Sequence, residues 1–318
     1  MKIAYYISMR RMIIRSFMGY PILSIFLSVS CLKQIEFPEN EYERNRSCNG
    51  FVHADSSINI FFISNSDFYS NPNFVQNGIS AQIKVNNSEV YELVKCKGSF
   101  YSSFKPSFGD SIALLFSYNN LTDYSAKTYV PFPVTNILTF QKDTFYIDES
   151  GIKAPIINVS FQNAKTPNQT NYYEIRTNVS TAIDSTGNWK PYYLPYTTPI
   201  GENSQKINEL EEYSIYKLLF NDSLFKKDKV SFDLIVSSIS DGKKLLVDSV
   251  KTQVVVRSVS KEYYHFMKSY IKHQANRSND LFSGPSVPIQ LYSNIKNGNG
   301  IFAGYSTTTA ELVVHHYE

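Results

Sequence analysis

The sequence predicts a mainly β protein made of two immunoglobulin-like β-sandwich domains, with one amphipathic helix and a glycine-rich turn packed on the second domain. Short runs rich in β-branched and aromatic residues recur along the chain, separated by clusters of Gly, Pro, Asn and Ser. Only one stretch carries apolar residues at helical spacing. A chain of 318 residues is long enough for two domains, which we place at 48–134 and 135–318.

The first thirty residues have the pattern of an export signal. They contain four cations, no anion and an apolar run that ends in small residues before Cys31. This run is shorter than the roughly 20 residues that span a bilayer. We therefore predict that residues 1–30 are a lipoprotein signal peptide, that Cys31 carries the lipid, and that 31–47 form a tether to the outer membrane. An uncleaved anchor and an ordinary cleaved signal are the alternatives.

The charge balance argues against nucleic-acid partners. The formal charge of +3 includes the four cations of the signal, and their removal leaves 27 Lys and Arg against 28 Asp and Glu. No cluster of basic residues remains to neutralise phosphates or dock on anionic lipids.

The first domain is predicted from strands with strict alternation. Residues 79–85 alternate apolar and polar, Asn86-Asn87-Ser88 follows, and 90–94 is apolar again, which is a hairpin pattern. Cys48 and Cys96 fall in the same domain, and an exported protein can oxidise them to a disulfide. Two free thiols are the alternative. A zinc site is disfavoured because no paired ligand spacing accompanies them.

The second domain begins after Pro131 and Pro133, since prolines interrupt a sheet ladder. Strands are predicted at 156–161, 172–176, 230–236 and 252–256.

A long polar insertion, 180–208, separates the middle two of these strands. Loops of this length are often functional. Aromatic residues on such a loop are typical anchors for a partner or ligand, but they can equally fold back onto the core. The aromatic residues concerned are Trp189, Tyr192, Tyr193 and Tyr196.

The C-terminal region begins with the amphipathic helix, predicted at about 260–274. Ser260 is a plausible N-cap and Glu262 lies in the first turn. The glycine-rich segment 292–306 follows, and we expect a tight turn there that buries its neighbouring side chains. These are Ile295, Ile301 and Phe302. Phosphate binding is disfavoured because no helix opens after the glycines.

These C-terminal residues resemble a family of Bacteroidota outer-membrane lipoproteins, the domain of unknown function "forty-two forty-nine". The family signature combines Ser-x-x-Tyr-Tyr, a helix, Tyr-Ser-Asn-Ile and a Gly-x-Gly-Ile-Phe-x-Gly-Tyr segment. The matching motif residues, for which we expect a structural role, are Tyr292, Asn294, Ile295, Gly298, Gly300, Ile301, Phe302, Gly304 and Tyr305. The resemblance implies an accessory or ligand-capture subunit of a TonB-dependent β-barrel transporter.

The sequence shows no recognisable catalytic motif. A nucleophile elbow, a zincin helix and histidines at metal-ligand spacing are all missing. We therefore predict no catalytic residue, metal or cofactor, and a protein that is not an enzyme. A structural or adhesive envelope lipoprotein is the alternative function, and a hydrolase with scattered catalytic residues is a third.

Overall fold

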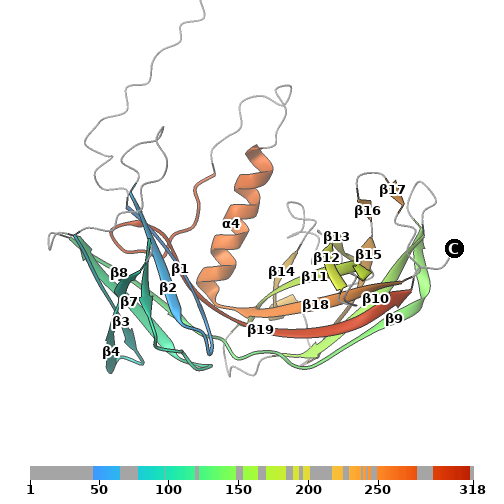
Figure 1. The fold of residues 1–318 in the computed structure, drawn as a ribbon, viewed down its shortest axis with the longest axis horizontal. Helices are drawn as coiled ribbons and strands as arrows, with labels where there is room; N and C mark the ends of the chain where they lie inside the picture. Colours follow the sequence, from blue (N-terminus) through green and yellow to red (C-terminus); the bar gives the residue numbers. More distant parts are fainter. Residues whose placement is uncertain are drawn as a thin grey trace, which may run out of the picture. The chain divides into compact units, whose positions relative to one another are not determined.

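The computed structural model describes residues 46–64, 78–96, 98–118, 122–147, 153–163, 170–183, 189–192, 196–200, 217–224, 229–237, 239–240, 243–244, 249–277 and 289–315. Within these ranges the protein is mainly β with one α-helix, which confirms the predicted fold class (Figure 1). No helix in this part of the chain is long and apolar enough to cross a membrane. The predicted signal peptide, Cys31 and most of the tether lie outside the described residues.

The first β-sandwich packs a sheet of order β4-β3-β7-β8 against one end of a larger sheet. Alternation buries Ala81, Ile83 and Val85 on one face of β3, because successive side chains point to opposite faces. The strands of this half are β1 (Arg46–His53), β2 (Ile58–Ser64), β3 (Ile79–Val85), β4 (Glu89–Glu92), β5 (Val94–Cys96), β6 (Ser99–Ser102), β7 (Ser111–Tyr118) and β8 (Thr122–Tyr129).

The second β-sandwich has its own core, formed by a sheet of order β13-β15-β10-β9 and the other end of the larger sheet. Phe161, Tyr173 and Phe220 are fully buried there. A short 3₁₀ helix, η1 (Asp222–Leu224), follows β14, and β16 and β17 form a separate pair. The strands are β9 (Thr135–Ile147), β10 (Lys153–Gln162), β11 (Tyr172–Ile183), β12 (Trp189–Tyr192), β13 (Tyr196–Ile200), β14 (Leu218–Asn221), β15 (Lys229–Ser237), β16 (Ile239–Ser240), β17 (Lys243–Lys244), β18 (Ser249–Val259) and β19 (Asn299–His315).

One long strand, β19, belongs to both sandwiches. It pairs in parallel with β1 over Asn299–Tyr305 and antiparallel with β18 over Tyr305–His315. The larger sheet therefore has the order β12-β11-β18-β19-β1-β2-β6-β5, with β14 also paired to β11 (Figure 1). Phe302 of β19 lies in the first core and Val314 lies in the second.

The helix α4 (Lys261–Arg277) packs on the opposite face of this sheet, as its apolar stripe predicts. Tyr263, Tyr264 and Met267 of α4 belong to one buried cluster with Ile301 and Ala303 of β19. The predicted N-cap is confirmed, since the Tyr263 amide donates to Ser260 Oγ at 3.3 Å.

The glycine-rich segment differs from its predicted placement. A turn is present, with the Gly298 amide donating to the Ile295 carbonyl at 3.4 Å. The segment then continues as β19, and Ile295 and Phe302 pack in the first core instead of on the second domain. Burial of Ile295, Ile301 and Phe302 is confirmed, with exposed fractions of 6%, 0% and 0%.

The candidate disulfide is absent, because Cys48 and Cys96 are both free thiols. Cys48 is buried on β1 and Cys96 is exposed on β5. Strands β2 and β6 lie between them in the sheet. Three inter-strand spacings of roughly 4.8 Å exceed the separation that a disulfide can bridge.

We predict that Phe302→Ala lowers the free energy of unfolding by about 3 kcal/mol or more, because it removes a fully buried ring between two sheets. Phe140→Ala is the matched control, since Phe140 on β9 is 54% exposed and should change stability by less than ~0.5 kcal/mol. Urea denaturation of both variants measures the difference. Equal effects would contradict the shared-strand architecture.

Candidate functional site

The glycine-rich segment 292–306 closes the free edge of β8. Strand β8 is the last strand of its sheet, so its outward backbone groups have no strand partner in the described sheet order. The Lys296 amide donates to the Ser125 carbonyl at 2.7 Å. Asn297 Nδ2 donates to the Asp123 carbonyl at 2.9 Å, and Asn294 Nδ2 lies 3.3 Å from the Lys127 carbonyl. Three successive outward carbonyls of β8 are thus satisfied by one short segment.

Carboxamide side chains also complete β19 where a neighbouring strand is missing. Asn294 accepts from the Phe302 amide at 2.9 Å and donates to the Phe302 carbonyl at 2.7 Å. At the other end of the strand, Gln141 makes the same pair of bonds with His315, both at 2.8 Å. Each carboxamide presents a donor and an acceptor together, as a neighbouring strand would.

Two glycines of the motif permit close backbone approach. A Cβ atom on Gly304 would lie 2.0 Å from the Tyr129 carbonyl oxygen. A Cβ atom on Gly300 would lie 2.0 Å from the Cys48 carbonyl oxygen, and Gly300 has a φ of +116° that L side chains rarely adopt. These two positions therefore require glycine for packing.

A buried hydrogen-bonded cluster joins β8, β19 and the start of α4. The Gly304 amide donates to Thr128 Oγ1 at 2.9 Å and approaches Ser260 Oγ at 3.3 Å. The Ser260 amide donates back to the Gly304 carbonyl at 2.9 Å. The Thr128 hydroxyl lies 3.2 Å from Ser260 Oγ and 3.3 Å from Glu262 Oε2, and it can donate to only one of them at a time.

A cleft of about 460 Å³ opens beside this cluster, between β8 and the first turn of α4. Its volume is in the range of small-molecule sites. The lining residues are Gly109, Ser111, Lys127, Thr128, Tyr129, Phe132 and Glu262.

The cleft combines an aromatic surface with groups of both charges. Phe132 is 45% exposed, and its ring covers Gly109, where a Cβ atom would lie 2.9 Å from the ring. Lys127 is exposed, and Glu262 is partly buried. Burial raises the pKa of Tyr129 to about 12, and the Glu262 carboxylate adds to this effect. The Tyr129 phenol therefore keeps its proton at neutral pH and can donate a hydrogen bond.

The sequence-predicted binding loop is largely not a loop. Trp189 and Tyr192 lie on β12, paired with Ile183 and Val179 of β11. Tyr196 lies on β13, opposite Ser237 of β15. Tyr193 falls outside the described residues. Both strands lie at the edge of a sheet, and the polar composition of this stretch gave no sign of them.

Sequence reasoning also missed the residues that line the cleft. The only local features at these positions are the prolines that flank Phe132 and the place of Glu262 in the first turn of the helix. No local signal brings these two residues together, since 129 intervening residues separate them in the chain. In the described part of the chain, no group of three or more His, Cys, Asp or Glu side chains could hold a metal.

A family model described as "Domain of unknown function (DUF4249)" matches residues 34–311. The chain belongs to this family. The match confirms the resemblance inferred from the C-terminal motif, and the family description assigns no activity. No curated protein matches the chain.

Three solved structures illustrate how distant the comparable folds are. A Bacteroides uniformis protein, proposed to bind carbohydrate, is 10% identical with a TM-score of 0.21, covering 85% of this chain and 99% of its own. The B domain of a biofilm-associated protein is 6% identical with a TM-score of 0.18, covering 84% and 85%. The T6 backbone pilin of Streptococcus pyogenes is 7% identical with a TM-score of 0.18, covering 83% and 63%. Such low TM-scores do not establish a common topology, so none of these structures bears on function.

We predict that Asn294→Ala lowers the free energy of unfolding by roughly 2 kcal/mol, because it leaves the backbone of buried Phe302 without its partner. Asn294→Asp keeps the acceptor for the Phe302 amide and loses the donor to the Phe302 carbonyl. Its free energy of unfolding should therefore differ from that of Asn294→Ala. Asn178→Ala is the control, since Asn178 is exposed, donates to the Gln253 side chain at 3.1 Å, and should be nearly neutral when truncated. Chemical denaturation ranks the three variants.

Proposed function

We propose that this protein is a lipid-anchored envelope protein that captures a small hydroxyl-rich ligand in the cleft between β8 and α4, as an accessory subunit of a TonB-dependent outer-membrane transporter. The single observation that carries the capture function is the cleft itself. It brings an exposed aromatic ring, an ammonium, a carboxylate and a protonated phenol to one concave surface.

This combination suits a neutral polyhydroxylated molecule such as a small saccharide. The apolar face of a sugar ring can pack on Phe132, while its hydroxyl groups can donate to Glu262 and accept from Lys127. A neutral ligand also leaves the opposite charges of Lys127 and Glu262 balanced. Binding sites of this kind hold a few polar groups on an otherwise apolar concave surface.

The lining residues of the cleft also fit a protein that binds its ligand without catalysing a reaction. The described lining residues include no histidine or cysteine, so a base–nucleophile pair of the familiar type does not lie among them. The glycines and the hydrogen-bonded cluster hold the cleft on rigid strands and a helix start, which favours a preformed binding site.

The membrane anchor and the transporter partner rest on the sequence. The pattern before Cys31 supports lipidation, and the family resemblance supports an accessory role beside a transporter. A structural envelope subunit is a second candidate. It is favoured by exposed apolar side chains on β9, where Leu138, Phe140 and Ile147 are 59%, 54% and 62% exposed.

We predict that titration of the detergent-solubilised full chain with neutral mono- and disaccharides shows saturable binding of at least one of them. Phe132→Ala and Lys127→Ala should each weaken binding about tenfold or more, because each removes one contact surface of the cleft. Both side chains are exposed, so the fold should be retained. Phe140→Ala is the control, since its ring is also exposed and lies outside the cleft. Calorimetric titration without any saturable binding, or binding that ignores both substitutions, would exclude capture at this cleft.

We predict that Cys31→Ala moves the protein from the membrane fraction to the soluble fraction and abolishes incorporation of a fatty-acid analogue. Affinity purification of the wild-type chain from its native envelope should recover one β-barrel transporter. Membrane attachment that survives Cys31→Ala would disprove the lipid anchor. Recovery of other envelope subunits without a transporter would favour the structural role.

A further inference from the structure

A partly buried cationic site lies on the face of the large sheet that α4 covers. Glu174 of β11 pairs with Arg257 of β18 across the sheet. On its other side β11 pairs with β14, with Glu174 opposite Leu219 and Ile175 opposite Leu218. Continuing this register by one residue brings Lys217 opposite Arg176. Three cations thus surround one carboxylate.

The Glu174 carboxylate is already engaged. Arg257 Nη1 donates to Glu174 Oε1 at 3.1 Å, and the Tyr263 hydroxyl donates to Oε2 at 2.9 Å. Lys217 Nζ lies 3.9 Å from Oε2, which is beyond hydrogen-bonding distance. The Glu174 side chain is only 2% exposed, so its charge is matched first by Arg257.

The remaining positive charge lacks a described counter-ion. Arg176 Nε and Arg257 Nε are buried without a hydrogen-bond partner among the described residues. Such unpaired donors are costly and rare in native proteins. Burial lowers the pKa of Lys217, the Glu174 carboxylate opposes this, and the charges of Arg257 and Arg176 lower it further. Like charges opposite one another on neighbouring strands are destabilising unless an anion separates them.

We propose that Arg176 and Lys217 bind an oxyanion group, a carboxylate or a phosphate, of a ligand that reaches this face of the sheet. A guanidinium presents paired donors that match the two oxygens of such a group, and an ammonium adds a point charge beside it. The Lys217 side chain is 25% exposed, which leaves a route from solvent. This site is independent of the proposed saccharide cleft, which is lined by one cation, Lys127, and one carboxylate, Glu262, and so has no excess charge.

The first turn of α4 contacts both places. Glu262 lines the cleft, and the next residue, Tyr263, bonds to Glu174. Arg257 also lies over the Tyr305 ring, 4.8 Å from its centre, which fixes the guanidinium on one side. Arg257 is therefore held by the protein, and Arg176 and Lys217 are the cations available to a ligand.

The test is calorimetric titration of the detergent-solubilised full chain with sodium phosphate and, separately, with citrate at low ionic strength. We expect saturable one-to-one binding of at least one anion. Arg176→Gln and Lys217→Met should each weaken it at least tenfold, and Arg176→Lys should have an intermediate effect because it keeps the charge and loses the paired donors. The anion that binds with the higher affinity shows whether the site prefers a phosphate or a carboxylate group.

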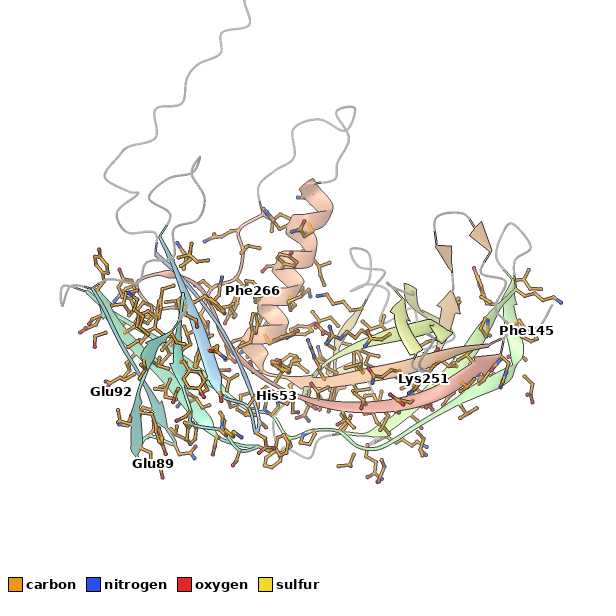
Figure 2. All side chains as sticks on the ribbon, in the orientation of Figure 1. His53, Glu89, Glu92, Phe145, Lys251 and Phe266 are labelled. Carbon is orange, nitrogen blue, oxygen red and sulfur yellow. The ribbon has the colours of Figure 1, made fainter. Side chains whose placement is uncertain are left out.

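Lys251→Gln is the matched control. Lys251 lies on β18 (Figure 2), six residues before Arg257 and therefore on the same face of the sheet. It already pairs with Glu311 at 2.7 Å. This substitution should leave anion binding unchanged. Absence of saturable binding, or an equal loss in Lys251→Gln, would overturn the proposal.

Thermal unfolding of the same variants separates ligand binding from a structural role. If Arg176 and Lys217 form a binding site, Arg176→Gln without anion should melt at the same temperature as the wild type or higher, because the substitution removes the repulsion between these two cations. Added phosphate or citrate should then stabilise the wild type and not the variant. A variant that melts lower without anion, and also fails to bind, would show that the cations serve the fold and would overturn the proposal.

Discussion

The buried contact of the Gly304 amide with Thr128 and Ser260 is the interaction on which the rest of this structure depends. It joins the edge of the small N-terminal sheet, the shared strand β19 and the N-cap of α4 at one point. A side chain at position 304 would collide with the Tyr129 carbonyl, so the contact requires glycine. Because the groups involved are buried, leaving any of them unpaired would cost more than an exposed hydrogen bond contributes.

Strand β19 can be long because side chains form hydrogen bonds with its backbone where a neighbouring strand is missing. A strand shared between two sandwiches lacks a neighbour along part of each edge, and unpaired backbone groups in a core are unfavourable. Asn294 fills one such gap at Phe302 and Gln141 fills another at His315. The family motif therefore encodes a structural closure, and its residues do not line the cleft between β8 and α4.

The two candidate binding places follow from this closure. Docking of α4 on β19 brings Glu262 beside β8 and Tyr263 beside Glu174. Neither place resembles a sequence motif, because each is assembled from strands and a helix that are distant in the chain. Binding residues that a fold assembles in this way are visible only once the elements are in contact.

Local pattern predicted the strands with clear alternation or long apolar runs, and the helix. The alternation of 79–85 predicted β3 with the bounds that the structure has, and the spacing of Tyr263, Met267 and Ile271 predicted the buried face of α4. Strand β9 escaped prediction because it is an edge strand with most side chains exposed, so its sequence carries little periodicity. The candidate disulfide failed because residue spacing along the chain does not report which strands lie between two cysteines.

By itself, the sequence determined the fold class, the family and the burial of Ile301 and Phe302, since these depend on periodicity and on motif residues. The tertiary structure alone decided that the glycine-rich segment enters the first sandwich, that Cys48 and Cys96 stay apart, and that Phe132 and Glu262 line one cleft. The physical reason is that strand order and edge closure are set by long-range hydrogen bonds, and these leave no periodic trace in neighbouring residues.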